Sequence, residues 1–107
     1  MPEPAHYLYM LRPTRADMLA TGLTAAEAEV VGRHAVYLRD LRDAGTLVLA
    51  GRTLTTQDTF GIAILKAGSE AEARRLMQDD PAVAGHVMTA TLYPYGIADM
   101  AASAAVG

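Results

Sequence analysis

The sequence predicts one α+β domain of the ferredoxin-like type, with the element order βαββαβ. Three observations predict it: four short apolar or aromatic runs, two stretches with helical periodicity, and a capping signature that opens each of those stretches. Right-handed crossovers would place both helices on one face of a four-stranded antiparallel sheet. A length of 107 residues fits a single domain, with a core over about residues 6–96 and an Ala-rich tail over 97–107.

The first strand and the first long helix are marked by clear boundaries. Residues 6–12, HYLYMLR, are mostly aromatic or apolar, and Pro13 ends the run because it cannot donate to a strand ladder. Thr24 and Glu27 form a capping box, which predicts the start of a helix. Gly45 supplies the left-handed conformation that stops this helix.

A hairpin and a second helix follow. Residues 47–50 and 60–65 are short apolar runs separated by the polar stretch TTQD, as expected for two paired strands. Ser69 and Glu72 repeat the capping-box signature and open a helix. This helix should end before Pro81, because the residue that precedes a proline is disfavoured in the helical conformation.

The last strand alternates cleanly between two kinds of residue. It runs over 87–95, with Thr89, Thr91 and Tyr93 on one side and Met88, Ala90 and Leu92 on the other. Both helices cover one face of the sheet, so the other face is left open. Because several side chains on that open face are apolar or aromatic, we expect a second copy of the chain to cover it, giving a homodimer.

Composition excludes several classes of function. Nine basic and twelve acidic side chains give a formal charge of −3, which argues against nucleic acid as a partner. The absence of cysteine excludes disulfides and thiolate chemistry and suits a cytoplasmic protein. The longest apolar runs fall far short of the ~20 residues that span a bilayer, and no secretory signal is visible, so no membrane partner is expected. No phosphate-binding glycine loop occurs, and we expect no cofactor.

His34 is the most informative candidate for chemistry. It falls on the apolar stripe of the long helix, together with Val30, Val31, Leu38 and Leu41, so its side chain should point inward. One interpretation is a core histidine whose nitrogens are satisfied by neighbours. The other is a general acid or base at the edge of a cavity.

A catalytic histidine usually needs a carboxylate that orients its ring, and Asp80 is our candidate. It lies where the second helix ends, and this junction can approach the middle of the first helix. Asp80 also suits a capping role for a short turn that starts at Pro81. Both roles can coexist, since a carboxylate has two oxygens with about four lone-pair sites.

Four further residues are candidates for substrate binding: Arg52, Arg12, Tyr9 and His86. The planar guanidinium of Arg52 or Arg12 could clamp a carboxylate or phenolate, although a solvated arginine at a strand end is an equally good interpretation. Tyr9 offers a phenol hydroxyl, but strand tyrosines are also ordinary packing residues. The three histidines do not have the close spacing of metal ligands, so no metal site is expected.

Several segments of the chain resemble the YCII-related proteins over about residues 6–96. They are Gly32–Ala35, Leu38–Arg52, Met77–Gly85 and Tyr93–Tyr95. The resemblance implies a ferredoxin-like fold, pairing into a dimeric α+β barrel, and an active-site dyad of a histidine and an aspartate. His34 and Asp80 match those two positions.

The same resemblance implies a range of reactions. One family member is a dehydrochlorinase of a chlorinated hydroxyhydroquinone, and the wider superfamily includes muconolactone isomerase and small monooxygenases. We therefore expect a cofactor-independent lyase, isomerase or dehydrochlorinase that acts on a small carbonyl or phenolic compound. The alternative is a non-catalytic dimer that binds a small ligand or serves as an accessory protein. The longer connection over 14–23, and His86 at a position where an apolar residue is common, depart from the family pattern and leave the substrate open.

Overall fold

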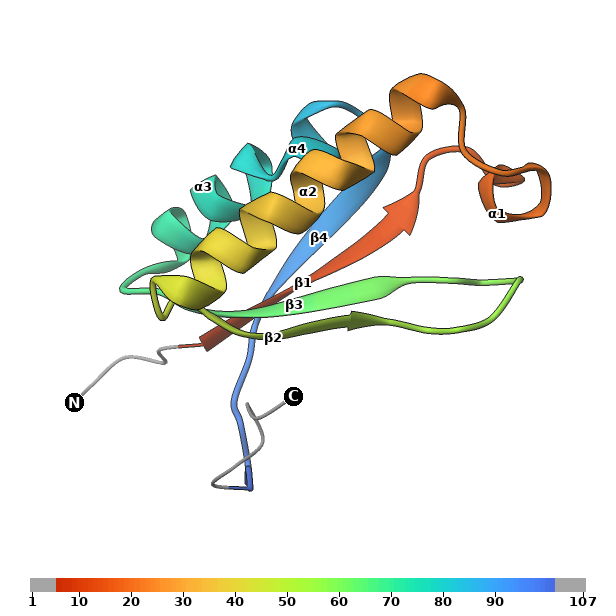
Figure 1. Ribbon diagram of the computed structural model, residues 1–107. Helices are drawn as coiled ribbons and strands as arrows, with labels where there is room; N and C mark the ends of the chain where they lie inside the picture. Colours follow the sequence, from red (N-terminus) through yellow and green to blue (C-terminus); the bar gives the residue numbers. More distant parts are fainter. Residues whose placement is uncertain (1–5, 102–107) are drawn as a thin grey trace.

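The computed structural model describes residues 6–101. A four-stranded antiparallel sheet with the strand order β2-β3-β1-β4 is covered on one face by helices, so the predicted α+β ferredoxin-like fold is confirmed (Figure 1). In chain order the elements are β1 (His6–Pro13), α1 (Met18–Thr21), α2 (Ala25–Asp43), β2 (Leu47–Arg52), β3 (Gly61–Lys66), α3 (Glu70–Asp79), α4 (Pro81–Ala84) and β4 (Met88–Pro94).

The central strand β1 separates the core from the open face of the sheet. Its odd-numbered residues Tyr7, Tyr9 and Leu11 are buried beneath the helices. Leu8 and Met10 point to the opposite face, because successive side chains of a strand alternate. The core therefore sits between the sheet and the helices, with Tyr9 and the β3 residue Leu65 both fully buried at its centre.

Helix α2 begins and ends where the local signals predict. The Thr24 hydroxyl accepts the Glu27 backbone N–H, and the Glu27 carboxylate accepts the Thr24 backbone N–H, which completes the capping box. Gly45 follows the helix with a φ of 82°, a left-handed conformation that suits glycine. The predicted inward stripe is only half-buried, because part of this helix face borders a pocket rather than packed side chains.

The second capping signature is only half realised. The Ser69 hydroxyl accepts the Glu72 backbone N–H as predicted, but the Glu72 carboxylate accepts the N–H of Gly68 instead of that of Ser69. Helix α3 then ends at Asp79. Asp80 is extended before Pro81, which opens the single-turn helix α4 at its first position.

The segment between β1 and α2 contains helix α1, which the sequence did not predict. Arg15 organises this segment: its guanidinium donates to Glu27, Asp17 and Thr21 and to the carbonyl of Gly22. The Arg15 partner lowers the pKa of the Glu27 carboxyl to about 2. This hydrogen-bonded cluster fixes the segment at one end of α2.

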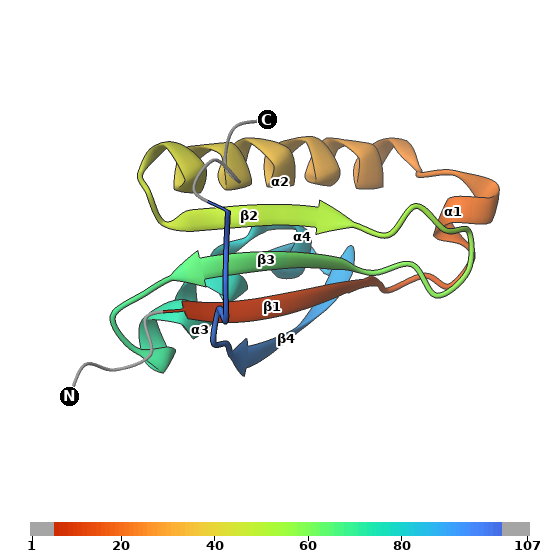
Figure 2. The same ribbon diagram turned by 90° about the horizontal axis from the view of Figure 1, so that it is seen from below.

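The face of the sheet opposite the helices has an apolar middle. In Figure 2 the sheet is seen from this side, and no helix lies in front of the strands. Paired positions of the four strands place on it the apolar residues Leu49, Ile64, Leu8, Met10 and Tyr93, together with Thr89 and Thr91 of β4. Leu49 and Tyr93 are each 45% exposed. No helix within residues 6–101 has the length and apolar character needed to cross a membrane.

Candidate active site

A buried carboxylate, Asp80, lies at the centre of the candidate site. The Tyr9 hydroxyl donates to its Oδ2 at 2.7 Å, and the Ala82 backbone N–H donates to its Oδ1 at 2.9 Å. His34 Nδ1 lies 2.7 Å from Oδ1 and 2.9 Å from Oδ2. The side chain is fully buried, and these contacts satisfy both oxygens. Asp80 thus contacts His34 and caps α4 at the same time.

These contacts fix the orientation and the tautomer of the His34 ring. An ionised carboxylate only accepts hydrogen bonds, and its other two partners are donors, so we assign the proton to Nδ1. In the neutral ring Nε2 is then the basic nitrogen. The His34 side chain is 14% exposed. Within residues 6–101 every buried side-chain nitrogen has a hydrogen-bond partner, and Nε2 of His34 has none, so Nε2 is not a buried atom. Nε2 therefore remains accessible to a molecule that enters the site.

Tyr9 supports this pair from the interior of the protein. Burial raises the pKa of its hydroxyl, and the negative charge of Asp80 raises that pKa further. Tyr9 consequently stays protonated and donates to the carboxylate. The sequence suggested Tyr9 as a substrate contact, but the side chain is fully buried behind Asp80 and does not line the pocket. Its position halfway along the central strand explains this, because the helices cover that part of the sheet.

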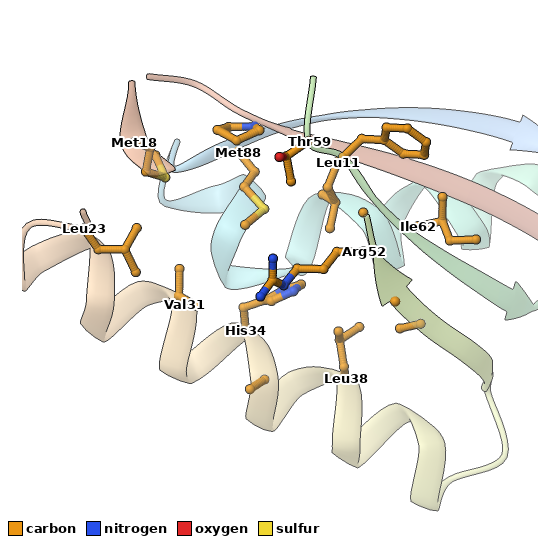
Figure 3. Close-up of a pocket in the computed structure, with 16 residues that line it drawn as sticks. Leu11, Met18, Leu23, Val31, His34, Leu38, Arg52, Thr59, Ile62 and Met88 are labelled. Atoms are coloured by element: carbon orange, nitrogen blue, oxygen red, sulfur yellow. The ribbon is translucent and has the colours of Figure 1, made fainter. Parts of the chain in front are cut away.

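The accessible face of His34 borders a pocket of about 450 Å³ between α2 and the sheet. This volume suits a small organic ligand. Its walls are mostly apolar, and the lining residues are Leu11, Pro13, Met18, Leu23, Val31, His34, Ala35, Leu38, Ala50, Gly51, Arg52, Thr59, Phe60, Gly61, Ile62 and Met88. In Figure 3 the side chains of His34 and Arg52 both point into this space, from α2 and from the end of β2. Arg52 is the one predicted substrate-binding residue that lines it.

Arg12 lies outside this pocket, which corrects its predicted role. Leu11 points toward the helices, so the next residue of the strand must point to the opposite face. There the Arg12 guanidinium stacks over Phe60, 5.3 Å from the ring centroid, and Nη2 lies 3.3 Å from Met10 Sδ. It borders a separate depression with the loop over 56–59.

His86 also lies outside the pocket. It is exposed in the turn after α4, where its φ of 60° is left-handed, and its carbonyl accepts the Thr14 hydroxyl at 3.0 Å. Within residues 6–101 no group of three His, Asp or Glu side chains is placed to hold a metal ion.

Comparison with known proteins gives a structural neighbour with the same fold. It is the 5-chloro-2-hydroxyhydroquinone dehydrochlorinase of Burkholderia phenoliruptrix AC1100, solved with 2,5-dihydroxybenzoquinone. The TM-score is 0.62 at 17% identity, and the match covers 84% of this chain and 93% of the dehydrochlorinase. No curated protein sequence matches the chain. The model of the YCII-related domain matches residues 6–95, almost the whole described fold, and the chain therefore belongs to the YCII-related family.

Proposed function

We propose that this protein is a small-molecule enzyme in which His34 transfers a proton on a carbonyl or phenolic substrate. The observation that carries the proposal is the placement of His34: Nδ1 is held by a buried carboxylate, while Nε2 borders an apolar pocket of about 450 Å³. A general base needs both features, a fixed ring and an open basic nitrogen.

The reaction class follows from these groups. Nε2 takes a proton from an acidic C–H or O–H of the substrate, and Asp80 stabilises the imidazolium that forms. The same proton can then return to another atom of the substrate, which gives an isomerase, or to a leaving group, which gives a lyase. In a dehydrochlorinase the C–Cl bond breaks, chloride leaves with the bonding electron pair, and His34 passes the proton to water. The known activity of the structural neighbour, a dehydrochlorinase, supports the last of these outcomes. The chain's own side chains suffice for each step, so we propose a cofactor-independent reaction.

A substrate screen tests this function. The protein is mixed in deuterated water with small phenols, lactones and halogenated hydroxyquinones, 5-chloro-2-hydroxyhydroquinone included, and each mixture is followed by NMR. We expect at least one compound to be converted, or to take up deuterium, faster than it does without protein. If compounds bind in the pocket and none is converted or exchanged, catalysis is contradicted and the chain is a ligand-binding protein.

We also propose that the chain forms a homodimer through the open face of the sheet. Leu49 and Tyr93 are 45% exposed there and adjoin further apolar side chains, an arrangement that costs free energy in contact with water. A second copy placed face to face would cover this surface, as in a dimeric α+β barrel.

Light scattering on two matched variants tests the dimer. We expect a mass of about twice the 11.3 kDa of one chain for the parent, and a shift toward the monomer for Leu49→Glu, because a carboxylate would be buried without a partner. Val36, on the outer side of α2, is 43% exposed, so Val36→Glu introduces the same charge at similar exposure and should leave the mass unchanged. A parent mass near 11 kDa at micromolar concentration would contradict the dimer.

A further inference from the structure

The pocket has open space in front of the Arg52 guanidinium because the residue paired with Arg52 on the neighbouring strand is Gly61, which has no side chain. Arg52, the last residue of β2, pairs with Gly61, which also pairs with Leu11 on the other side. Paired residues point to the same face, so a side chain at position 61 would project into the pocket. Its Cβ would lie 3.2 Å from the Gly51 carbonyl oxygen and 3.7 Å from Arg52 Cβ. The missing side chain leaves this end of the pocket free for a ligand.

Arg52 also brings a positive charge that nothing nearby neutralises. Within residues 6–101 its guanidinium makes no hydrogen bond or ion pair. Arg33, Arg39 and Arg75 are likewise unpaired within these residues, but of the four only Arg52 lines the pocket. No carboxylate lines the pocket. Asp80 lies behind His34, and its carboxylate oxygens already accept hydrogen bonds from His34, Tyr9 and the Ala82 backbone N–H.

An unpaired guanidinium beside apolar walls favours one class of ligand. The guanidinium is always charged, and its planar fork matches the two oxygens of a carboxylate or the oxygen of a phenolate. The apolar lining, which includes Leu11, Leu38 and Met88, favours a hydrocarbon ring over a hydrated polar chain. The two ionisable side chains of the pocket therefore have different tasks: Arg52 anchors the ligand and His34 transfers the proton.

We propose that the pocket selects a small monoanionic ring compound whose oxyanion pairs with Arg52 while its reacting atom faces Nε2 of His34. The anion site at Arg52 is argued from the pocket alone. The placement of the reacting atom at Nε2 of His34 rests on the proposed function. Together they narrow the substrate class to rings with one ionised carboxyl or phenol group.

Binding of charged and neutral probes of the same shape tests the anion site. Dissociation constants are measured by NMR titration for benzoate against benzamide and for 4-nitrophenolate against 4-nitroanisole. For the parent we expect each anion to bind about tenfold more tightly than its neutral partner. A preference for benzoate alone would assign the site to carboxylates, and a preference for nitrophenolate alone would assign it to phenolates.

Three arginine variants show whether Arg52 causes the preference. Arg52→Gln keeps a hydrogen-bonding side chain and removes the charge, so the anion and its neutral partner should bind about equally. Arg52→Lys keeps the charge without the planar fork and should retain part of the preference. Arg39→Gln removes the same charge from an exposed position on α2 outside the pocket and should leave the preference intact.

Failure of this inference differs from failure of the proposed function. Equal binding of the charged and neutral probes to the parent, or no binding of any probe at millimolar concentration, overturns the anion site even if His34 is catalytic. Loss of the charge preference in Arg52→Gln but not in Arg39→Gln supports the anion site even if no compound is ever converted.

Discussion

Replacement of His34 by asparagine is expected to lower turnover by ~10²-fold or more while the fold persists. The amide of asparagine can still donate a hydrogen bond toward Asp80, but it has no nitrogen that accepts a proton near neutral pH. The variant therefore removes the base and keeps a polar side chain at the half-buried position on α2. Turnover is measured on the compound that the NMR screen converts fastest, at substrate concentrations above and below the KM.

The matched control is His6→Asn. It makes the same chemical change at the start of β1, where the side chain does not border the pocket, and should leave turnover unchanged. Thermal unfolding of both variants shows that each is folded before rates are compared. Turnover of His34→Asn equal to that of the parent would exclude histidine catalysis and leave the ligand-binding protein as the better interpretation.

The dyad could be predicted because each member carried a strong local signal. His34 interrupted an otherwise apolar helical stripe, and Asp80 stood before a proline at the end of a helix. Both signals concern a residue's own helix, and the ferredoxin-like topology then limits which helix faces can meet. These two facts made a contact between positions 34 and 80 possible, and the distance of 2.7 Å between His34 Nδ1 and Asp80 Oδ1 confirms it.

The other residues of the site were harder to predict, because whether a strand residue lines the pocket depends on how far inside the sheet it lies. Tyr9 and Arg12 lie three positions apart on β1, so strand alternation alone shows that they face opposite sides and cannot both line one pocket. Tyr9 faces the helices but lies too far inside, and its bond to Asp80 joins residues 71 positions apart. Arg52 could be recognised only as a strand end, and the open space beside it depends on Gly61 of the neighbouring strand.

Helix α1 was missed for a different reason. It has only four residues, too few to show helical periodicity, and it has no capping side chain. Its surroundings are fixed instead by Arg15, whose partners extend from Asp17 to Glu27. Such a cluster depends on the three-dimensional path of the segment. From the residue pattern, only a longer connection over residues 14–23 could be predicted.

Replacement of Asp80 by alanine is expected to cause a large loss of stability, about 3–5 kcal/mol in the free energy of unfolding. The side chain is fully buried and accepts from Tyr9, His34 and Ala82, so its removal leaves these donors facing a small cavity. The cap of α4 is lost as well. Urea unfolding followed by circular dichroism measures the effect.

The control for this effect is the neighbouring residue in the chain. Asp79 is exposed and makes no side-chain hydrogen bond or ion pair within residues 6–101, so Asp79→Ala should change the free energy of unfolding by no more than about 0.5 kcal/mol.

If Asp80→Ala lowers the unfolding midpoint so far that the protein does not fold, Asp80→Asn serves in its place. Its amide oxygen can still accept one hydrogen bond, while its amide N–H₂ faces donors, so we expect a smaller but clear loss.

A double-mutant cycle with Tyr9→Phe separates the hydrogen bond from the other effects of the Asp80 substitution. In the parent, loss of the Tyr9 hydroxyl removes a buried donor to a charged group and should cost about 1.5–3 kcal/mol. In Asp80→Asn the same substitution should cost less, because the charged acceptor is already gone. Equal costs of Tyr9→Phe in the two backgrounds would show that Tyr9 and Asp80 are not coupled. The buried carboxylate would then have to be held by His34 and the α4 backbone alone.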